Sequence, residues 1–278
     1  MPRRAASTAA AENVGTNSKP KFYTRHERFV LGGLAVAVAL LLWEALGRSG
    51  RISPIFLSSP SSIAVAGVKM ARAGELSQHL WVSGRELFLG YSVAALIAVP
   101  LGLVAGWYRR LNFVLDPFLS ALYATPRVAL LPLIILWVGV GIWSKVAIVF
   151  LGAFFPICIN TIAGVRTVDQ SHLMVARSFR GDDLHVFKTI ILPSSFPFIL
   201  AGLRLGVGRA LVGVVVGEFY AASAGIGFLI AIAGATFQTD KVFVGIAIIA
   251  AFGMVCNELL LKAERRVERW RPVVDSAS

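Results

Sequence analysis

Six long apolar stretches, separated by shorter polar segments, dominate the pattern of this chain. A helix needs about 20 apolar residues to cross the roughly 30 Å hydrocarbon core of a bilayer, and each stretch is close to or above that length. The pattern therefore predicts six transmembrane helices, at residues 29–47, 86–107, 113–139, 146–165, 195–220 and 242–262.

Two apolar segments are interrupted or short. The stretch at 113–139 contains Asp116-Pro117, Pro126-Arg127 and Pro132. Because proline removes a helix hydrogen bond and clashes with the preceding turn, we expect this segment to begin as an interfacial helix and to kink at the prolines. Residues 222–235 are apolar but shorter than a span. They are predicted to form a re-entrant segment on the outer side, which is tolerated only where protein or water covers the backbone.

Composition indicates an all-α polytopic membrane protein. Hydrophobic residues make up 56% of the chain and charged residues only 15%, whereas about a quarter of a soluble domain is charged. The net charge of +12 would suit a nucleic-acid partner, but the basic residues lie between and beside the apolar stretches. Most of them fall in cytoplasmic segments if both termini are inside, as the positive-inside rule requires. The remainder, Lys145 among them, then lie outside, so an N-in/C-in topology and no nucleic-acid partner are predicted.

The segments flanking the apolar stretches carry their own predictions. Residues 1–28 are rich in small and polar residues, which is typical of a disordered cytoplasmic tail, and 266–278 form a second one. Residues 29–77 hold the first helix, which lacks a small-residue cleavage site and is predicted to stay uncleaved. They also hold most of the external loop at 48–85, in which a short surface helix is expected at 63–73.

Residues 174–193 form a polar island between two of the predicted transmembrane stretches. Apolar residues recur in it at helical spacing, at Val175, Phe179, Val186 and Ile190. A helix here would present one apolar face and one charged face. Gly181 then interrupts the chain, and Asp182 or Asp183 is suited to N-cap a second short helix. The residues alone leave two alternatives, a knob that docks into a groove on a soluble partner or an ordinary cytoplasmic loop.

The polar island resembles the cytoplasmic EAA loop of ABC importer permeases. That loop reads Glu-Ala-Ala, three residues, Gly, nine residues and Ile-x-Leu-Pro. Ile190-x-Leu192-Pro193 matches its end, so the Glu-Ala-Ala positions fall on Met174, Val175 and Ala176, and the Gly position falls on Arg180. Further similarity to the nitrate, sulfonate and taurine branch lies at 130–141, 152–156, 160–161 and 197–210. The resemblance extends in order over residues 78–265.

This resemblance implies the type I ABC importer permease fold, with a core of five helices at 78–265 and a coupling loop at 166–193. It implies that a cytoplasmic ATP-binding cassette ATPase dimer docks on Met174, Val175, Ala176, Ser178, Phe179, Arg180, Gly181, Asp182 and Leu184. The other implied partners are the lipid membrane, a second permease subunit (homodimer or heterodimer) and a periplasmic or lipoprotein substrate-binding protein. The implied location is the bacterial inner (plasma) membrane.

Two residues depart from the pattern of that family. Met174 stands where the family has Glu, and Arg180 stands where it has Gly. Met174 cannot make a carboxylate's hydrogen bonds, while Gly181 can take over the left-handed turn. We expect either a compensating acidic residue on the cognate ATPase or a second permease that bears the intact motif.

Charged and polar residues inside the apolar stretches are candidates for the transport pathway. A charge in a span is costly unless it is paired or hydrated. Arg209 is the first choice as a pathway cation, although a structural pair is its alternative role. Glu218 is predicted to be either such a partner or a gate residue near the outer face, and Asn160 is a weaker candidate.

Glycines of the fifth stretch predict close helix packing. GxxxG pairs let two helix backbones approach, and this stretch has two, Gly202/Gly206 and Gly213/Gly217. They serve either packing within one subunit or an interface between two subunits, which a permease of six spans needs to enclose a pathway.

Motifs for catalysis, metals or cofactors are missing from the sequence. It has no GxxxxGK[ST] phosphate loop, its four histidines have no metal-ligand spacing, and Cys158 and Cys256 lie in apolar stretches that favour buried core thiols. ATP hydrolysis is therefore expected on a separate subunit, and this chain is not predicted to be an enzyme. The function predicted is the permease subunit of an ATP-driven importer for a small anion or organic solute. The alternative is a secondary transporter without an ATPase partner, although no internal repeat supports it.

Overall fold

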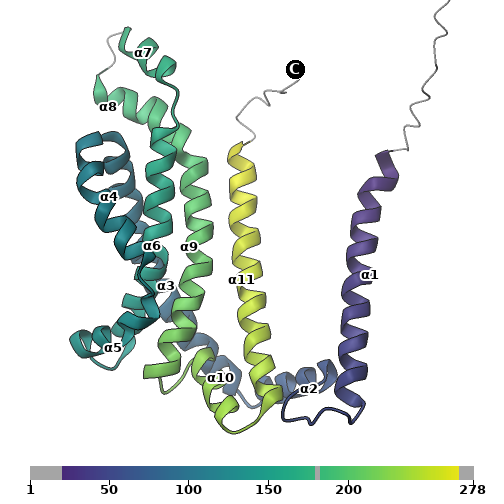
Figure 1. Cartoon of the computed structure of the whole chain (residues 1–278). Helices are drawn as coiled ribbons and strands as arrows, with labels where there is room; N and C mark the ends of the chain where they lie inside the picture. Colours follow the sequence, from purple (N-terminus) through teal and green to yellow (C-terminus); the bar gives the residue numbers. More distant parts are fainter. Residues whose placement is uncertain (1–20, 179–181, 269–278) are drawn as a thin grey trace, which may run out of the picture.

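The computed structural model describes residues 21–178 and 182–268, and over these residues it consists of helices and connecting turns (Figure 1). The elements are α1 (Lys21–Arg48), α2 (Pro60–Arg72), α3 (Glu75–Trp107), α4 (Arg109–Ala124), α5 (Arg127–Val138), α6 (Ile142–Arg166), α7 (Gln170–Ser178), α8 (Asp183–Val186), the π-helical segment η1 (Phe187–Ile191), α9 (Leu192–Ala221), α10 (Ile226–Ala235) and α11 (Thr239–Glu268).

The predicted spans are found in the described residues. Five helical stretches are long and apolar enough to cross a membrane, and α4 with α5 adds a sixth, bent by 99°. The break falls at Thr125 and Pro126, which both have extended backbone angles, as expected from Pro126. Pro117 and Pro132 lie inside α4 and α5, so the sharp bend is confined to one of the three predicted prolines.

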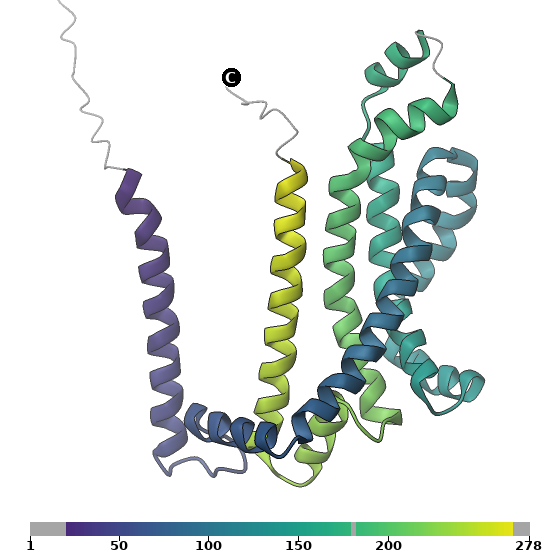
Figure 2. The ribbon, with the colours of Figure 1, turned by 180° about the vertical axis from the view of Figure 1, so that it is seen from behind.

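The two ends of the bundle carry different elements. α7 and α8 lie at one end with the start of α1 and the end of α11, whereas α2, α5 and α10 lie at the opposite end (Figures 1 and 2). Both ends of the described chain are therefore on the α7 side, in agreement with the N-in/C-in topology. α10 is a short apolar helix that turns back between α9 and α11, in the place of the predicted re-entrant segment.

The external loop is shorter than predicted. The surface helix expected at 63–73 is α2, which Ser59 N-caps through a hydrogen bond from the backbone amide of Ser62. α3 then begins at Glu75 instead of near residue 86. Its extra turns contain charged residues that sequence hydropathy places in a loop. Among them, Glu75 lies 4.0 Å from Lys241. Glu86, the first residue of the predicted span, is paired inside the protein.

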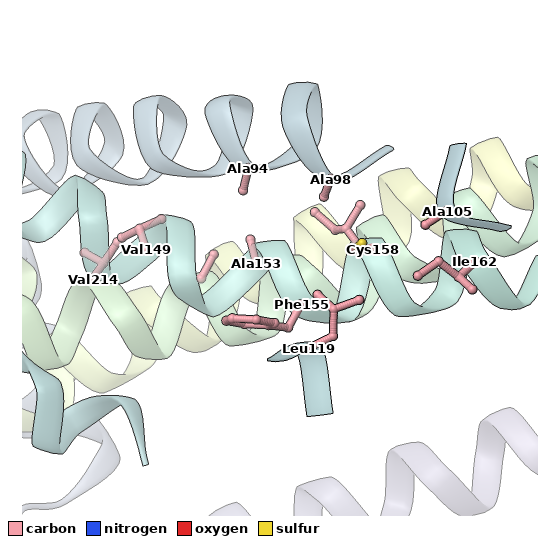
Figure 3. Packing of buried hydrophobic residues seen from close by; sticks show 12 residues of the cluster. Ala94, Ala98, Ala105, Leu119, Val149, Ala153, Phe155, Cys158, Ile162 and Val214 are labelled. Carbon is pink, nitrogen blue, oxygen red and sulfur yellow. The ribbon is translucent and has the colours of Figure 1, made fainter. Parts of the chain in front are cut away.

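The core is formed where α6 packs between α3 and α9. Small residues of α3, including Ala94 and Ala98, face Val149, Ala153 and Cys158 of α6 (Figure 3). Glycines allow the same close approach. A Cβ built on Gly102 of α3 would lie 2.6 Å from Cβ of Thr161, well inside normal contact. Cys158 is fully buried in this cluster, as predicted for a core thiol.

The GxxxG glycines of α9 also pack within the chain. Gly202 and Gly206 contact α6 at Ile157, Gly213 contacts it beside Val149, and Gly217 contacts Lys145. All four glycines are buried. The alternative of a subunit interface through these glycines is therefore corrected, because α6 of the same chain occupies the surface that a second copy would need.

Candidate functional site

α7 and α8 form the helical knob predicted for the polar island. Asp182 N-caps α8 by accepting a hydrogen bond from the His185 backbone amide at 3.0 Å, which is one of the two caps expected. Phe179, Arg180 and Gly181 lie outside the described residues. The two helices project from the end of the bundle that carries both described ends of the chain (Figure 1).

The apolar residues of the knob divide into an exposed set and a buried set. Met174, Val175 and Leu184 are 64%, 57% and 58% exposed. Val186, expected on the same face as Val175, is instead only 1% exposed, whereas Ile190 packs against a small cluster that contains Val165 of α6. Val186 therefore anchors the knob to its own chain, and we call Met174, Val175 and Leu184 the exposed coupling face. Ala176 is half-buried and Ser178 caps the carbonyl of Met174 at 3.0 Å.

The knob is joined to the bundle through continuous helix. α8 passes through η1 into α9 without a loop. Phe187 at the start of η1 packs edge-on against Trp107 at the end of α3, with ring centroids 5.9 Å apart. The knob is therefore connected to α9 by helix, with no loop between them.

A cavity of about 320 Å³ lies at the break between α4 and α5. This size is at the lower end of the range for small-molecule sites. Elements far apart in the sequence build it, with the break on one side and α6 and α9 on the other. Its lining residues are Tyr123, Ala124, Thr125, Pro126, Arg127, Val128, Ile148, Gly152, Arg209, Val212, Gly213 and Val216.

Two arginines line this cavity. Arg209 of α9 is the cation singled out from the sequence, and the structure brings Arg127 at the start of α5 into the same cavity. The Arg127 guanidinium lies 5.4 Å from the ring centroid of Tyr123 and 5.8 Å from that of Phe155. Such cation–π contacts stabilise the charge away from water. Sequence reasoning used Arg127 only as part of a kink, although a charge beside a proline inside an apolar stretch is the signal that could have identified it.

Asn160, the weaker pathway candidate, lies outside this cavity, and so does Arg204, a second arginine of α9. Asn160 donates to the carbonyl of Pro156 in its own helix at 2.8 Å and packs against Gly202, so it is part of the α6–α9 contact. Arg204 pairs with Glu264 of α11 at 3.2 Å. Neither residue lines the cavity at the α4–α5 break.

Glu218 belongs to a buried polar cluster and does not pair with Arg209. Its carboxylate accepts hydrogen bonds from Ser83 Oγ at 2.5 Å and from the Gly227 amide at 2.6 Å. Glu86 of α3 lies beside it and pairs with Lys145 Nζ at 3.2 Å. Glu218 and Glu86 are 1% and 2% exposed, so the expected role of Glu218 as a partner of Arg209 is corrected. Lys145, predicted in an external segment, is buried in the first turn of α6.

This cluster holds the start of α10 in place. The first amides of a helix have no partner within the helix. Here the Gly227 amide bonds to Glu218, the Ile226 amide to Ser83 Oγ at 2.8 Å, and the Gly225 amide to His79 Nδ1 at 3.0 Å. α3 and α9 therefore supply the cap that α10 lacks in its own sequence.

Three features together are typical of a transport permease. The chain has membrane-spanning helices, a helical knob at the end of the bundle where the described chain begins and ends, and a cavity among the spanning helices. The chain belongs to the family of binding-protein-dependent transport system inner membrane components, whose family model matches residues 98–269. It is therefore a membrane permease subunit of an ABC importer, and members of this class work with an ABC ATPase and a substrate-binding protein.

Particular relatives cover most of the chain. The aliphatic sulfonates transport permease protein SsuC of Bacillus subtilis is 37% identical over 86% of this chain and 87% of its own length. The taurine transport system permease protein TauC of Escherichia coli is 33% identical over 84% of this chain and 87% of its own length. Among solved structures, an inward-facing MetNI methionine ABC transporter has a TM-score of 0.58 at 15% identity, over 70% of this chain and 94% of that one. The last likeness concerns the fold.

Proposed function

We propose that this chain forms a small-anion pathway across a bacterial inner membrane and that two copies of it, or one copy with a related permease, enclose that pathway. The observation that carries the proposal is the pair of arginines in the cavity at the α4–α5 break, because uncompensated charge inside a span marks a substrate or ion path. The names of the sulfonate and taurine relatives support an organic anion of that class. The substrate would arrive from an external binding protein.

The exposed coupling face is the proposed docking site for the ATPase dimer. Three large apolar side chains exposed on two short helices at the cytoplasmic end are suited to a groove on a soluble partner, since apolar anchors dominate many interfaces. Phe179, Arg180 and Gly181 lie between these helices in the sequence and belong to the same proposal.

A charge placed on the coupling face should prevent docking. We expect Val175→Asp and Leu184→Asp each to reduce co-purification of the ATPase by about tenfold or more, because a carboxylate buried without a partner at an interface costs more than 1.4 kcal/mol. Val65→Asp on α2, an exposed valine at the opposite end of the bundle, is the matched control and should leave the complex intact. Equal recovery of ATPase with all three variants would disprove the docking site.

Met174 and Arg180 differ from the family pattern, and we expect the ATPase that binds this chain to carry complementary negative charge. Met174→Glu with Arg180→Gly lowers the local charge by two units, and rim charges act mainly on association rate and salt dependence. We expect the double variant to bind its own ATPase more weakly and with a smaller salt dependence. Co-purification across a salt series measures this. A complex unchanged by the double replacement would show that the departures are neutral.

Uptake separates this proposal from the secondary-transporter alternative. Proteoliposomes that hold the permease, its ATPase and the binding protein should accumulate labelled ethanesulfonate only with internal ATP. Accumulation that follows an ion gradient in the absence of the ATPase would favour the alternative.

A further inference from the structure

The charge of the cavity at the α4–α5 break is unbalanced. Arg127 and Arg209 both line it, and they are near enough for their charges to interact. None of the lining residues is acidic. Within the described residues neither arginine forms an ion pair. Two cations that share a cavity inside a span repel each other, so an anion held between them would remove an unfavourable interaction.

Arg127 lies against two aromatic rings at one end of the cavity. Its guanidinium lies against the rings of Tyr123 and Phe155, and these two rings are 6.5 Å apart between centroids. Its Nε is buried without a hydrogen-bond partner. The residue also lines the cavity, and a planar guanidinium binds oxyanions through two parallel hydrogen bonds. An oxyanion group is therefore the ligand that fits this end of the cavity.

The remaining wall is apolar. Val128 of α5, Ile148 of α6, and Val212 and Val216 of α9 line it. Such a wall gains stability by covering an aliphatic group. It offers no carboxylate to an ammonium group, which would therefore lose its hydration without gaining a partner.

We propose that this cavity is a selective site for an organic monoanion with a short aliphatic tail, and that it discriminates against zwitterions of the same size. Arg127 and Arg209 bind the oxyanion head, and the valine and isoleucine side chains cover the tail. The inference rests on the proposed function and narrows its substrate class, since ethanesulfonate would be accepted and taurine, which differs from it by one ammonium group, would be disfavoured. Arg209 lies on α9, the helix that continues from the knob.

Direct binding to the permease–ATPase complex in lipid nanodiscs tests this site without the binding protein. We expect ethanesulfonate to bind at least about tenfold more tightly than taurine, and butanesulfonate more tightly than ethanesulfonate, because each added methylene is covered by the apolar wall. Arg127→Gln and Arg209→Gln should each weaken ethanesulfonate binding by about tenfold or more. Arg127→Lys should restore less than half of the loss in binding free energy, because an ammonium cannot form the two parallel bonds.

The control is Arg72→Gln on α2, which removes the same charge from an exposed arginine at the external end and should leave binding unchanged. Equal affinity for taurine and ethanesulfonate would overturn the selectivity, and full affinity in both glutamine variants would overturn the site. Either result leaves the proposed function standing if the complex still assembles and hydrolyses ATP. A permease that fails to retain any ATPase in nanodiscs would instead contradict the proposed function.

Discussion

Lys145→Met is expected to destabilise the folded permease by about 3–5 kcal/mol, because removing one partner of a buried ion pair leaves an uncompensated buried charge. Lys145 pairs with Glu86 at 3.2 Å, and both side chains are more than nine-tenths buried. Glu218 lies in the same cluster, so the variant would leave two buried carboxyl groups together without their buried cation. At about 2–4 °C per kcal/mol for a chain of this size, the thermal midpoint in detergent should fall by about 10 °C.

Two further variants show whether Lys145→Met destabilises the protein by breaking the ion pair or by a packing defect. Lys145→Met combined with Glu86→Gln removes both charges and should recover part of the lost stability, since the two sites are directly coupled. Lys241→Met is the matched control, because its pair with Glu75 is 4.0 Å long and partly exposed and such pairs contribute at most about 1 kcal/mol. If the Lys145→Met variant has the same thermal midpoint as the parent protein, the cluster does not stabilise the fold.

Gly102→Ala is expected to cost about 1–3 kcal/mol, and Gly102→Val is expected to prevent accumulation of folded protein, because added atoms in a close-packed interface force the two helices apart. The Cβ of the new residue would lie 2.6 Å from Cβ of Thr161 and 2.9 Å from the backbone oxygen of Cys158. Backbone and Cβ atoms cannot rotate away as a side-chain tip does.

The control lies on the same helix. A Cβ on Gly84 of α3 meets nothing within 4 Å, so Gly84→Ala should be neutral or stabilising by about 0.5–1 kcal/mol through lower chain entropy in the unfolded state. The thermal midpoints of the two alanine variants, compared with the parent, test the prediction. Similar melting of Gly102→Ala and Gly84→Ala would mean that α3 and α6 are less closely packed than described.

Features set by local sequence were predictable. The break at Pro126, the N-cap of Asp182 and the short surface helix at 60–72 follow from the chemistry of neighbouring residues. The long apolar stretches likewise identified the spans, because a hydrophobic core of fixed thickness imposes their length.

Features that depend on long-range contacts were not predictable in the same way. The Ser83–Glu218 hydrogen bond joins residues 135 positions apart, and no local pattern shows that the two meet. Hydropathy therefore placed Lys145 in an external loop, when a distant carboxylate allows it to be buried. The glycines of α9 were ambiguous for the same reason, since GxxxG indicates close packing without naming the neighbouring helix.

α8 continues through η1 into α9 without a loop, so the length of α9 decides how far its residues move if the helix tilts. The 30 residues of α9 extend for about 45 Å at 1.5 Å per residue, with the knob at one end and the α10 cap at the other. Arg209 lies part-way along this arm and Glu218 lies near its far end, so a tilt about the knob displaces Glu218 more than Arg209. The start of α10, whose amides bond to Ser83 and Glu218, would then move farther than the arginine in the cavity at the α4–α5 break.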